Sequence, residues 1–222
     1  MDQNQIWTYV SLLSPIVLLL GISIGLYSFK HLGVSTRYLF YYLVLCLVAD
    51  FLCRYFGYYS RFKYNLFIVP IFGFFELAIF SKLYYSHILR RKSNILIGFM
   101  VLALLCVSSE LLFVSRLLHL KNFQSFGKVI ADVVIVLYCL MYYWRIFNGS
   151  IPIVKEHRYL NVAALIYFSI NLVLFLPINF LVNESISVVF LFWVLNLVSL
   201  NLFYLVLIYL IWQNGKIRKC LR

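Results

Sequence analysis

The chain has 222 residues, of which 64% are hydrophobic and only 12% charged, and its formal net charge is +12. Water-soluble domains carry about 25% charged residues, so this composition excludes a soluble fold. Apolar stretches of about 20 residues recur, which suits helices crossing a hydrocarbon core about 30 Å thick, whereas spanning strands are about half as long. The sequence therefore predicts an all-α, polytopic membrane bundle.

Seven apolar spans follow one another along the chain, separated by short loops. They cover about residues 6–29, 38–59, 65–85, 95–115, 127–147, 159–182 and 186–212, and a basic tail is predicted at 213–222. Neither a linker nor an extramembrane segment large enough to fold separately is evident, so residues 1–222 are expected to form one transmembrane domain. Within the first span, Gly21 and Gly25 form a GxxxG pattern, which permits close helix approach.

Lysine and arginine divide unequally between the two sets of alternate loops. The larger set contains Lys30, Arg37, Lys82, Arg90, Arg91, Lys92, Arg145, Lys155, Arg158, Lys216, Arg218, Lys219 and Arg222. The smaller set contains Arg54, Arg61, Lys63, Arg116, Lys121 and Lys128. Basic loops favour the cytoplasmic side, so the amino terminus is predicted outside and the carboxyl terminus in the cytoplasm.

The positive charge is therefore interpreted as a determinant of the orientation of the chain in the membrane. Anionic lipid headgroups of the bilayer are its natural partners, and no nucleic acid is expected, because the basic residues occupy short loops rather than one continuous face.

Four cysteines lie in spans and Cys220 in the tail, without the spacing of a disulfide framework. The four histidines lie in predicted loops without metal-ligand spacing, and no nucleotide fingerprint occurs, so neither a metal nor a cofactor is predicted.

Four carboxylates interrupt the apolar spans: Asp50, Glu76, Glu110 and Asp132. Each costs about 2.5–3.5 kcal/mol on insertion scales, so such groups usually pair or face a cavity, and they are functional candidates. In the predicted orientation Asp50, Glu110 and Asp132 lie in the outer halves of their helices, and Glu76 lies near mid-membrane. An outward-facing polar pocket is the resulting hypothesis.

Two of these acids have a cation four residues away, on the same helix face. Arg54 follows Asp50, and Lys128 precedes Asp132. Either the pairs line an outer cavity that holds a small charged or zwitterionic ligand or relays a proton, or they are intrahelical salt bridges whose cations reach the headgroups. The two interpretations weigh equally for Asp50 with Arg54, and the salt bridge is favoured for Asp132 with Lys128.

Glu76 has no cation nearby in its own span, so it needs a partner across the bundle or a proton. One interpretation is a neutral Glu76 that is hydrogen-bonded to an asparagine or a tyrosine. Asn171, Asn196 and Asn201 lie at comparable depth and could supply that bond, although bonds that join helices to one another are the favoured role for them. The predicted ligand or proton pathway consists of Asp50, Arg54, Glu76, Glu110, Lys128, Asp132, Asn171 and Asn196.

Short motifs carry a family resemblance. The stretch from Tyr64-Asn65 through Phe75-Glu76-Leu77 to Lys82-Leu83-Tyr84, with later positions around Trp144, Asn161 and Asn171, resembles a family of uncharacterised bacterial seven-helix integral membrane proteins. Some of its members are encoded beside sensor histidine kinases. The resemblance therefore implies a location in a bacterial inner membrane and a signalling partner of that kind.

Three functions are therefore considered. The first is a sensory or signalling membrane component with an outward-facing polar pocket, whose short loops require a separate output protein such as a histidine kinase. The alternative is a small-solute or proton-coupled transporter. An intramembrane acid–base enzyme that uses two of the four carboxylates ranks third.

Overall fold

A computed structural model describes residues 3–59, 65, 67–89, 94–112, 126–181 and 186–220. Within these ranges the chain forms seven long helices, as predicted, and no strand. They are α1 (Gln3–Ser28), α2 (Val34–Arg54), α3 (Ile68–Leu83), α4 (Asn94–Leu112), α6 (Phe126–Phe147), α7 (Lys155–Leu181) and α8 (Ile186–Cys220). A 3-10 turn, Phe29–His31, leads into α2, while π-helical turns extend α2 over Tyr55–Tyr59 and α3 over Tyr84–Ile88.

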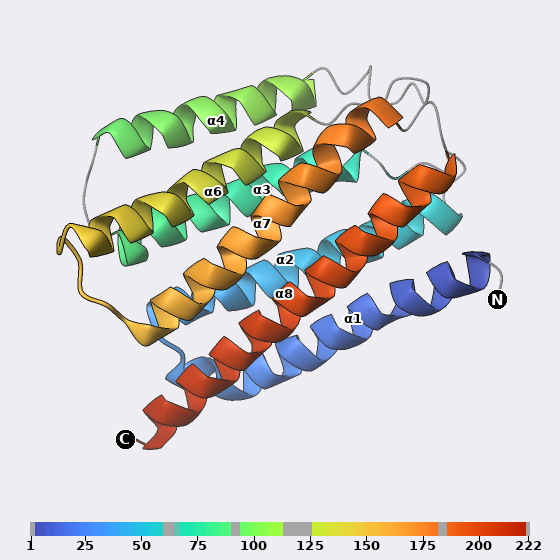
Figure 1. Cartoon of the computed structure of the whole chain (residues 1–222). Helices are drawn as coiled ribbons and strands as arrows, with labels where there is room; N and C mark the ends of the chain where they lie inside the picture. Colours follow the sequence, from blue (N-terminus) through green and yellow to red (C-terminus); the bar gives the residue numbers. More distant parts are fainter. Residues whose placement is uncertain are drawn as a thin grey trace.

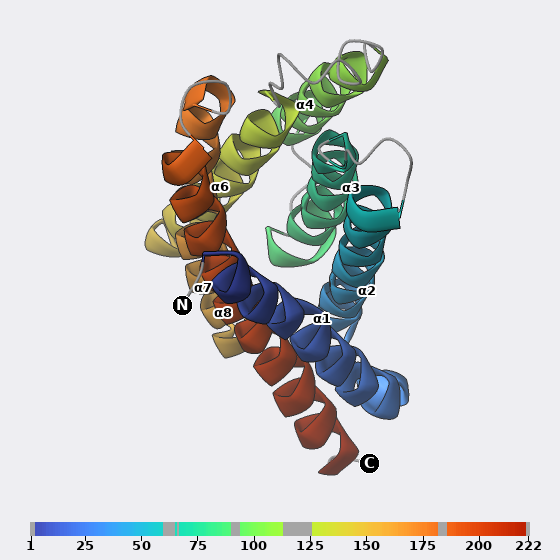
Figure 2. The same ribbon diagram turned by 90° about the vertical axis from the view of Figure 1, so that its right-hand side faces the viewer.

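The helices form one elongated bundle, with the two termini at opposite ends (Figure 1). Six helices pack in a ring, because α1 contacts α2, α2 contacts α3, α3 contacts α6, α6 contacts α7, α7 contacts α8, and α8 returns to α1. Helix α4 lies outside this ring against α3 and α6 (Figure 2). The interior between α3, α6 and α7 is therefore shielded on several sides.

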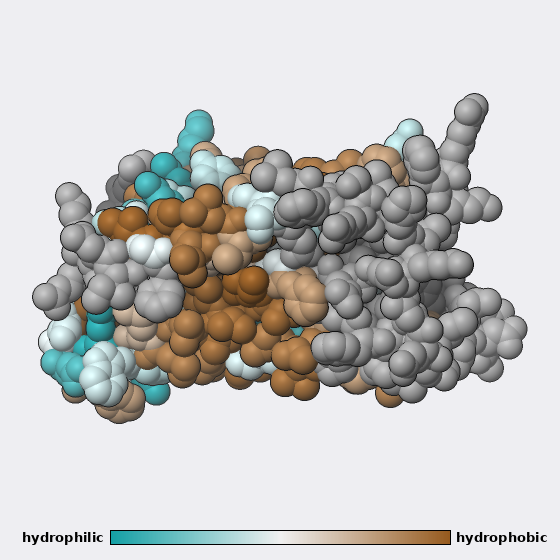
Figure 3. Space-filling view, turned by 90° about the horizontal axis from the view of Figure 1, so that it is seen from above, coloured by the Kyte–Doolittle hydropathy of each residue, from teal (hydrophilic) through white to brown (hydrophobic). Residues whose placement is uncertain are grey.

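Six of the helices are long and apolar enough to cross a membrane, and α4 adds a shorter apolar stretch, Met100–Ser109. Large apolar side chains such as Leu20, Leu105 and Val173 are exposed on the outside of the bundle. Figure 3 shows a broad hydrophobic band over the described surface, with polar residues gathered at one end. In water such a surface would be costly, whereas lipid chains cover it without penalty. The chain is a multi-pass membrane protein.

Glycines set how closely α1 approaches its neighbours. A Cβ atom added at Gly21 would lie 2.6 Å from the side chain of Ile208 in α8, and one at Gly25 would lie 2.3 Å from the ring of Phe40 in α2. Both contacts are too short for any larger residue without movement of the neighbour. The predicted GxxxG pair thus contacts two different helices, one glycine for each.

The carboxyl-terminal segment departs from the sequence prediction. Residues 213–222 are expected as a basic tail, but α8 continues as far as Cys220. Asn214 and Gly215 are buried, and a Cβ atom at Gly215 would lie 2.6 Å from Ser28 at the end of α1. The helix continues because this last part of it packs against the rest of the bundle.

Candidate functional site

Three charged side chains from two helices meet inside the bundle, and we call Glu76, Lys128 and Asp132 the buried triad. Lys128 Nζ donates hydrogen bonds to Glu76 Oε2 and to Asp132 Oδ1, the latter at 2.6 Å. The exposed fractions are 0% for Glu76, 2% for Lys128 and 0% for Asp132. The triad therefore joins α3 to α6 through charges that water does not reach.

Tyr42 adds a third helix to this cluster. Its hydroxyl donates to Glu76 Oε1 at 2.7 Å, and Tyr42 is itself fully buried in α2. Both carboxylate oxygens of Glu76 are thus satisfied, one by a phenol and one by an ammonium group. The first of the two predicted alternatives, a partner across the bundle, is confirmed for Glu76. Its partners are Lys128 and a tyrosine, Tyr42, rather than one of the three asparagines considered for it.

Aromatic rings surround the lysine head group. Lys128 Nζ lies 5.8 Å from the ring centroid of Phe72, 5.5 Å from that of Phe168 and 6.0 Å from that of Phe175. Distances of about 6 Å or less allow a cation to be attracted to the negative face of a ring. Rings from α3 and α7 therefore help to hold the ammonium group in a site without water.

Lys128 packs against the α3 backbone at Gly73. A Cβ atom at Gly73 would meet Lys128 Cδ at 3.4 Å and Lys128 Cα at 3.5 Å, so the lysine stem packs directly on the α3 backbone. Gly73 precedes Glu76 by almost one turn, which places the carboxylate on the same side of α3. This local arrangement directs Lys128 inward, in contrast to the favoured sequence interpretation, in which Lys128 reaches the headgroups.

The triad has two acids for one base. Asp132 Oδ2 is buried and has no hydrogen-bond partner among the residues that the structure describes. With both carboxylates ionised the cluster carries one net negative charge, and one added proton neutralises it. Buried charged groups are expensive unless paired, so this surplus carboxylate is the chemically distinctive feature of the site.

Asp50 and Arg54 form the second predicted pair, and it is separate from the triad. Arg54 Nε donates to Asp50 Oδ2 at 2.7 Å, and the guanidinium group also donates to the carbonyl oxygen of Ser11 in α1. Both side chains are about one-quarter to one-fifth exposed. The pair is a partly exposed connection between α2 and α1, and its intrahelical salt bridge is confirmed.

Asn171 and Asn196 contact each other, joining α7 to α8. Asn196 Nδ2 donates to Asn171 Oδ1 at 2.6 Å, and both side chains are buried. Asn201 instead donates to the carbonyl oxygen of Leu197 in its own helix. The side chain of Glu110 in α4, the remaining predicted site residue, lies outside the described part of the chain.

Replacing Asn196 with leucine should lower the free energy of unfolding only slightly, by about 0.6 kcal/mol and at most about 1.7 kcal/mol, the range for interhelical hydrogen bonds in membranes. Reversible unfolding in detergent micelles measures this. A loss several times larger would show that this pair does more than join two helices.

A row of polar contacts leads from the triad toward the opposite end of α3 and α6. Ser81 Oγ lies 3.2 Å from Tyr138 Oη, and Tyr84 Oη donates to Asn161 Oδ1 in α7 at 2.8 Å. Further on, Arg145 donates to the carbonyl oxygen of Leu89 at 2.7 Å. Since the order of contacts is the same in both helices, α3 and α6 run parallel and are connected along most of their length.

Asn214 forms a junction at the end that carries most of the basic residues. Its Oδ1 accepts from the backbone N–H of Gly33 at 2.9 Å, and its Nδ2 contacts both carboxylate oxygens of Glu156 at 2.8 Å. This residue therefore connects α8 with the α1–α2 link and with the start of α7. Sequence reasoning missed it because a single asparagine beside basic residues is typical of an exposed tail.

Comparisons with protein-family models, curated proteins and solved structures find no match.

Proposed function

We propose that this chain is a sensory component of a bacterial inner membrane, and that the buried triad is its switch. A proton that arrives from the outer side changes the charge of the triad. The altered pairing between α3 and α6 is then passed to the basic cytoplasmic end, where a separate output protein such as a histidine kinase reads it. The observation that carries this proposal is a buried cluster with one surplus carboxylate that bridges two helices.

Two features of the described contacts support a switch. A buried charge is stable only while the opposite charge beside it is present. Loss or gain of one charge in the triad therefore favours a different packing of α3 against α6. The row of contacts from Ser81 to Arg145 joins the same two helices beyond the triad. A contiguous network of contacts can couple a buried site to a distant face of the protein when the site and the face both shift the same two-state equilibrium.

The predicted orientation fits this proposal. Lys128 of the triad lies in the first turn of α6, and the positive-inside rule assigns this end of the helix to the outer side. The polar contacts from Ser81 to Arg145 continue from the triad toward the opposite end. Loops are short throughout, so the output must come from another protein.

A fluorescence experiment on oriented proteoliposomes tests the proposal. Trp144, which is exposed near the end of α6, is replaced by cysteine in a background without other accessible cysteines, and an environment-sensitive dye is attached. A change of external pH should change the dye signal. Asp132→Asn should abolish that response, whereas Asp50→Asn, which removes a carboxylate from outside the triad, should retain it. A dye signal that does not change with external pH, or a pH response that is lost equally in both variants, would refute the switch.

Proton-coupled transport is the second candidate. Asp132 Oδ2 favours it, because this buried oxygen has no hydrogen-bond partner among the described residues and can accept a proton inside the bundle. A pH-sensitive dye inside the same vesicles distinguishes the two functions. A sensor binds protons without sustained flux, whereas a transporter gives continuous flux that Asp132→Asn abolishes.

A further inference from the structure

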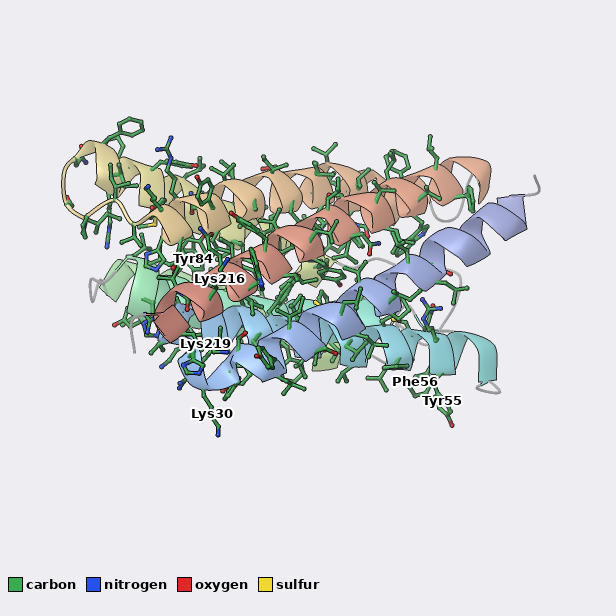
Figure 4. All side chains as sticks on the ribbon, turned by 90° about the horizontal axis from the view of Figure 1, so that it is seen from below. Lys30, Tyr55, Phe56, Tyr84, Lys216 and Lys219 are labelled. Carbon is green, nitrogen blue, oxygen red and sulfur yellow. The ribbon has the colours of Figure 1, made fainter. Side chains whose placement is uncertain are left out.

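We infer that the seam between α1 and α8, at the end that carries most of the basic residues, binds the phosphate headgroup of an anionic phospholipid. The site comprises Lys30 beside α1 together with Lys216 and Lys219 on α8, and we call these the seam lysines. All three are exposed, and Figure 4 places them at the same end of the bundle. The inference is independent of the proposed switch.

Aromatic side chains place the seam lysines at the depth of the headgroups. Lys219 Nζ lies 3.4 Å from Tyr27 Oη and 5.4 Å from the centre of the Tyr27 ring, so it bridges α8 and α1. Lys216 Nζ lies 5.3 Å from the centre of the Trp212 ring, one turn earlier in α8. Tyrosine and tryptophan concentrate at membrane interfaces, with lysine ammonium groups reaching outward beyond them.

Helix periodicity gathers these groups on a common face. Tyr27 and Lys30 are three residues apart at the end of α1, and Trp212, Lys216 and Lys219 follow one another at helical spacing on α8. The two helices are held close here, since Gly215 packs against Ser28. Ammonium groups from both sides of the seam therefore lie at the same end of the bundle.

Charge complementarity selects an anionic occupant. The nearest described acid along α7, Glu156, already binds Asn214, and the other described acids, Asp50 and the two of the triad, lie elsewhere in the bundle. Each basic residue near a membrane surface contributes about 1 kcal/mol of attraction to anionic lipid. That is roughly a fivefold preference per lysine, because about 1.4 kcal/mol corresponds to a factor of ten.

Native mass spectrometry of the full chain released from nanodiscs tests this site. The nanodiscs contain equal amounts of phosphatidylcholine and phosphatidylglycerol, and the measured quantity is the ratio of the two lipids that remain bound. The wild type should retain phosphatidylglycerol selectively. The variant K30Q/K216Q/K219Q should lose that selectivity by roughly a hundredfold, since three lysines each worth about fivefold are removed.

Two further variants decide between a site and general attraction. K82Q/K155Q/R158Q removes three exposed charges from α3 and α7 rather than from α1 and α8, and it should keep the selectivity. K30R/K216R/K219R should also keep it, which controls for folding. Equal losses in both glutamine variants, unchanged selectivity in K30Q/K216Q/K219Q, or no selectivity in the wild type would each overturn the inference, the last leaving an acidic protein as the occupant to examine.

Discussion

Replacing Lys128 with methionine is expected to lower the free energy of unfolding by about 3–5 kcal/mol, the cost of removing one partner from a buried ion pair. The substitution leaves two carboxylates, Glu76 and Asp132, facing each other in a site that water does not reach. Methionine has a similar length and flexibility, so lost packing contributes little. Reversible unfolding in mixed detergent micelles measures the change.

Two comparisons isolate the charge effect. Lys155→Met alters an exposed lysine at the start of α7 and should change stability by less than about 1 kcal/mol. The triple variant E76Q/K128M/D132N removes all three charges together and should recover most of the loss, because replacing a whole buried ion cluster is often nearly neutral. A triple variant as unstable as Lys128→Met would mean that shape, not charge, controls the site.

Replacing Asn214 with leucine is expected to cost about 2–3 kcal/mol, because it leaves the Gly33 N–H and the Glu156 carboxylate without their partner. Three contacts between 2.8 and 2.9 Å are lost at once from a side chain that is only 3% exposed. The same unfolding assay measures this. Because the junction connects α8, α7 and the α1–α2 link, cleavage of the link by added protease should also become faster.

Gln213 supplies the matched control for that experiment. It precedes Asn214, is partly buried, and its Oε1 has no hydrogen-bond partner among the described residues. Gln213→Met should therefore change the free energy of unfolding by less than about 1 kcal/mol, since little hydrogen bonding is lost. If Gln213→Met were as damaging as Asn214→Leu, the junction would not explain the stability of this end.

The spans could be predicted from sequence because the bilayer imposes a length on every helix that crosses it. Seven helices appear at the expected places in the described chain, six of them long and apolar enough to cross a membrane, although α2 and α7 begin about four residues earlier than predicted. Salt bridges within a helix were also predictable. Arg54 with Asp50 and Lys128 with Asp132 follow directly from a four-residue spacing.

Contacts between helices were not predictable in the same way, because they depend on which helices are neighbours and how each is rotated. Lys128 and Glu76 are 52 positions apart, and the sequence of neither span indicates that the two residues pair. A lysine in the first turn of a helix can point to the headgroups or into the bundle. Here Gly73 and the three phenylalanine rings direct it inward, and those features are recognisable only once α3, α6 and α7 are packed together.

The central claim is that the charge of the triad sets the relative arrangement of α3 and α6. Spin labels at Lys82 and Trp144, both exposed near the far ends of these helices, report the distance between them by double electron–electron resonance. Glu76→Gln and Asp132→Asn should shift the distance distribution relative to the wild type, while Asp50→Asn should leave it unchanged. A wild-type distribution that persists in both triad variants would contradict the claim.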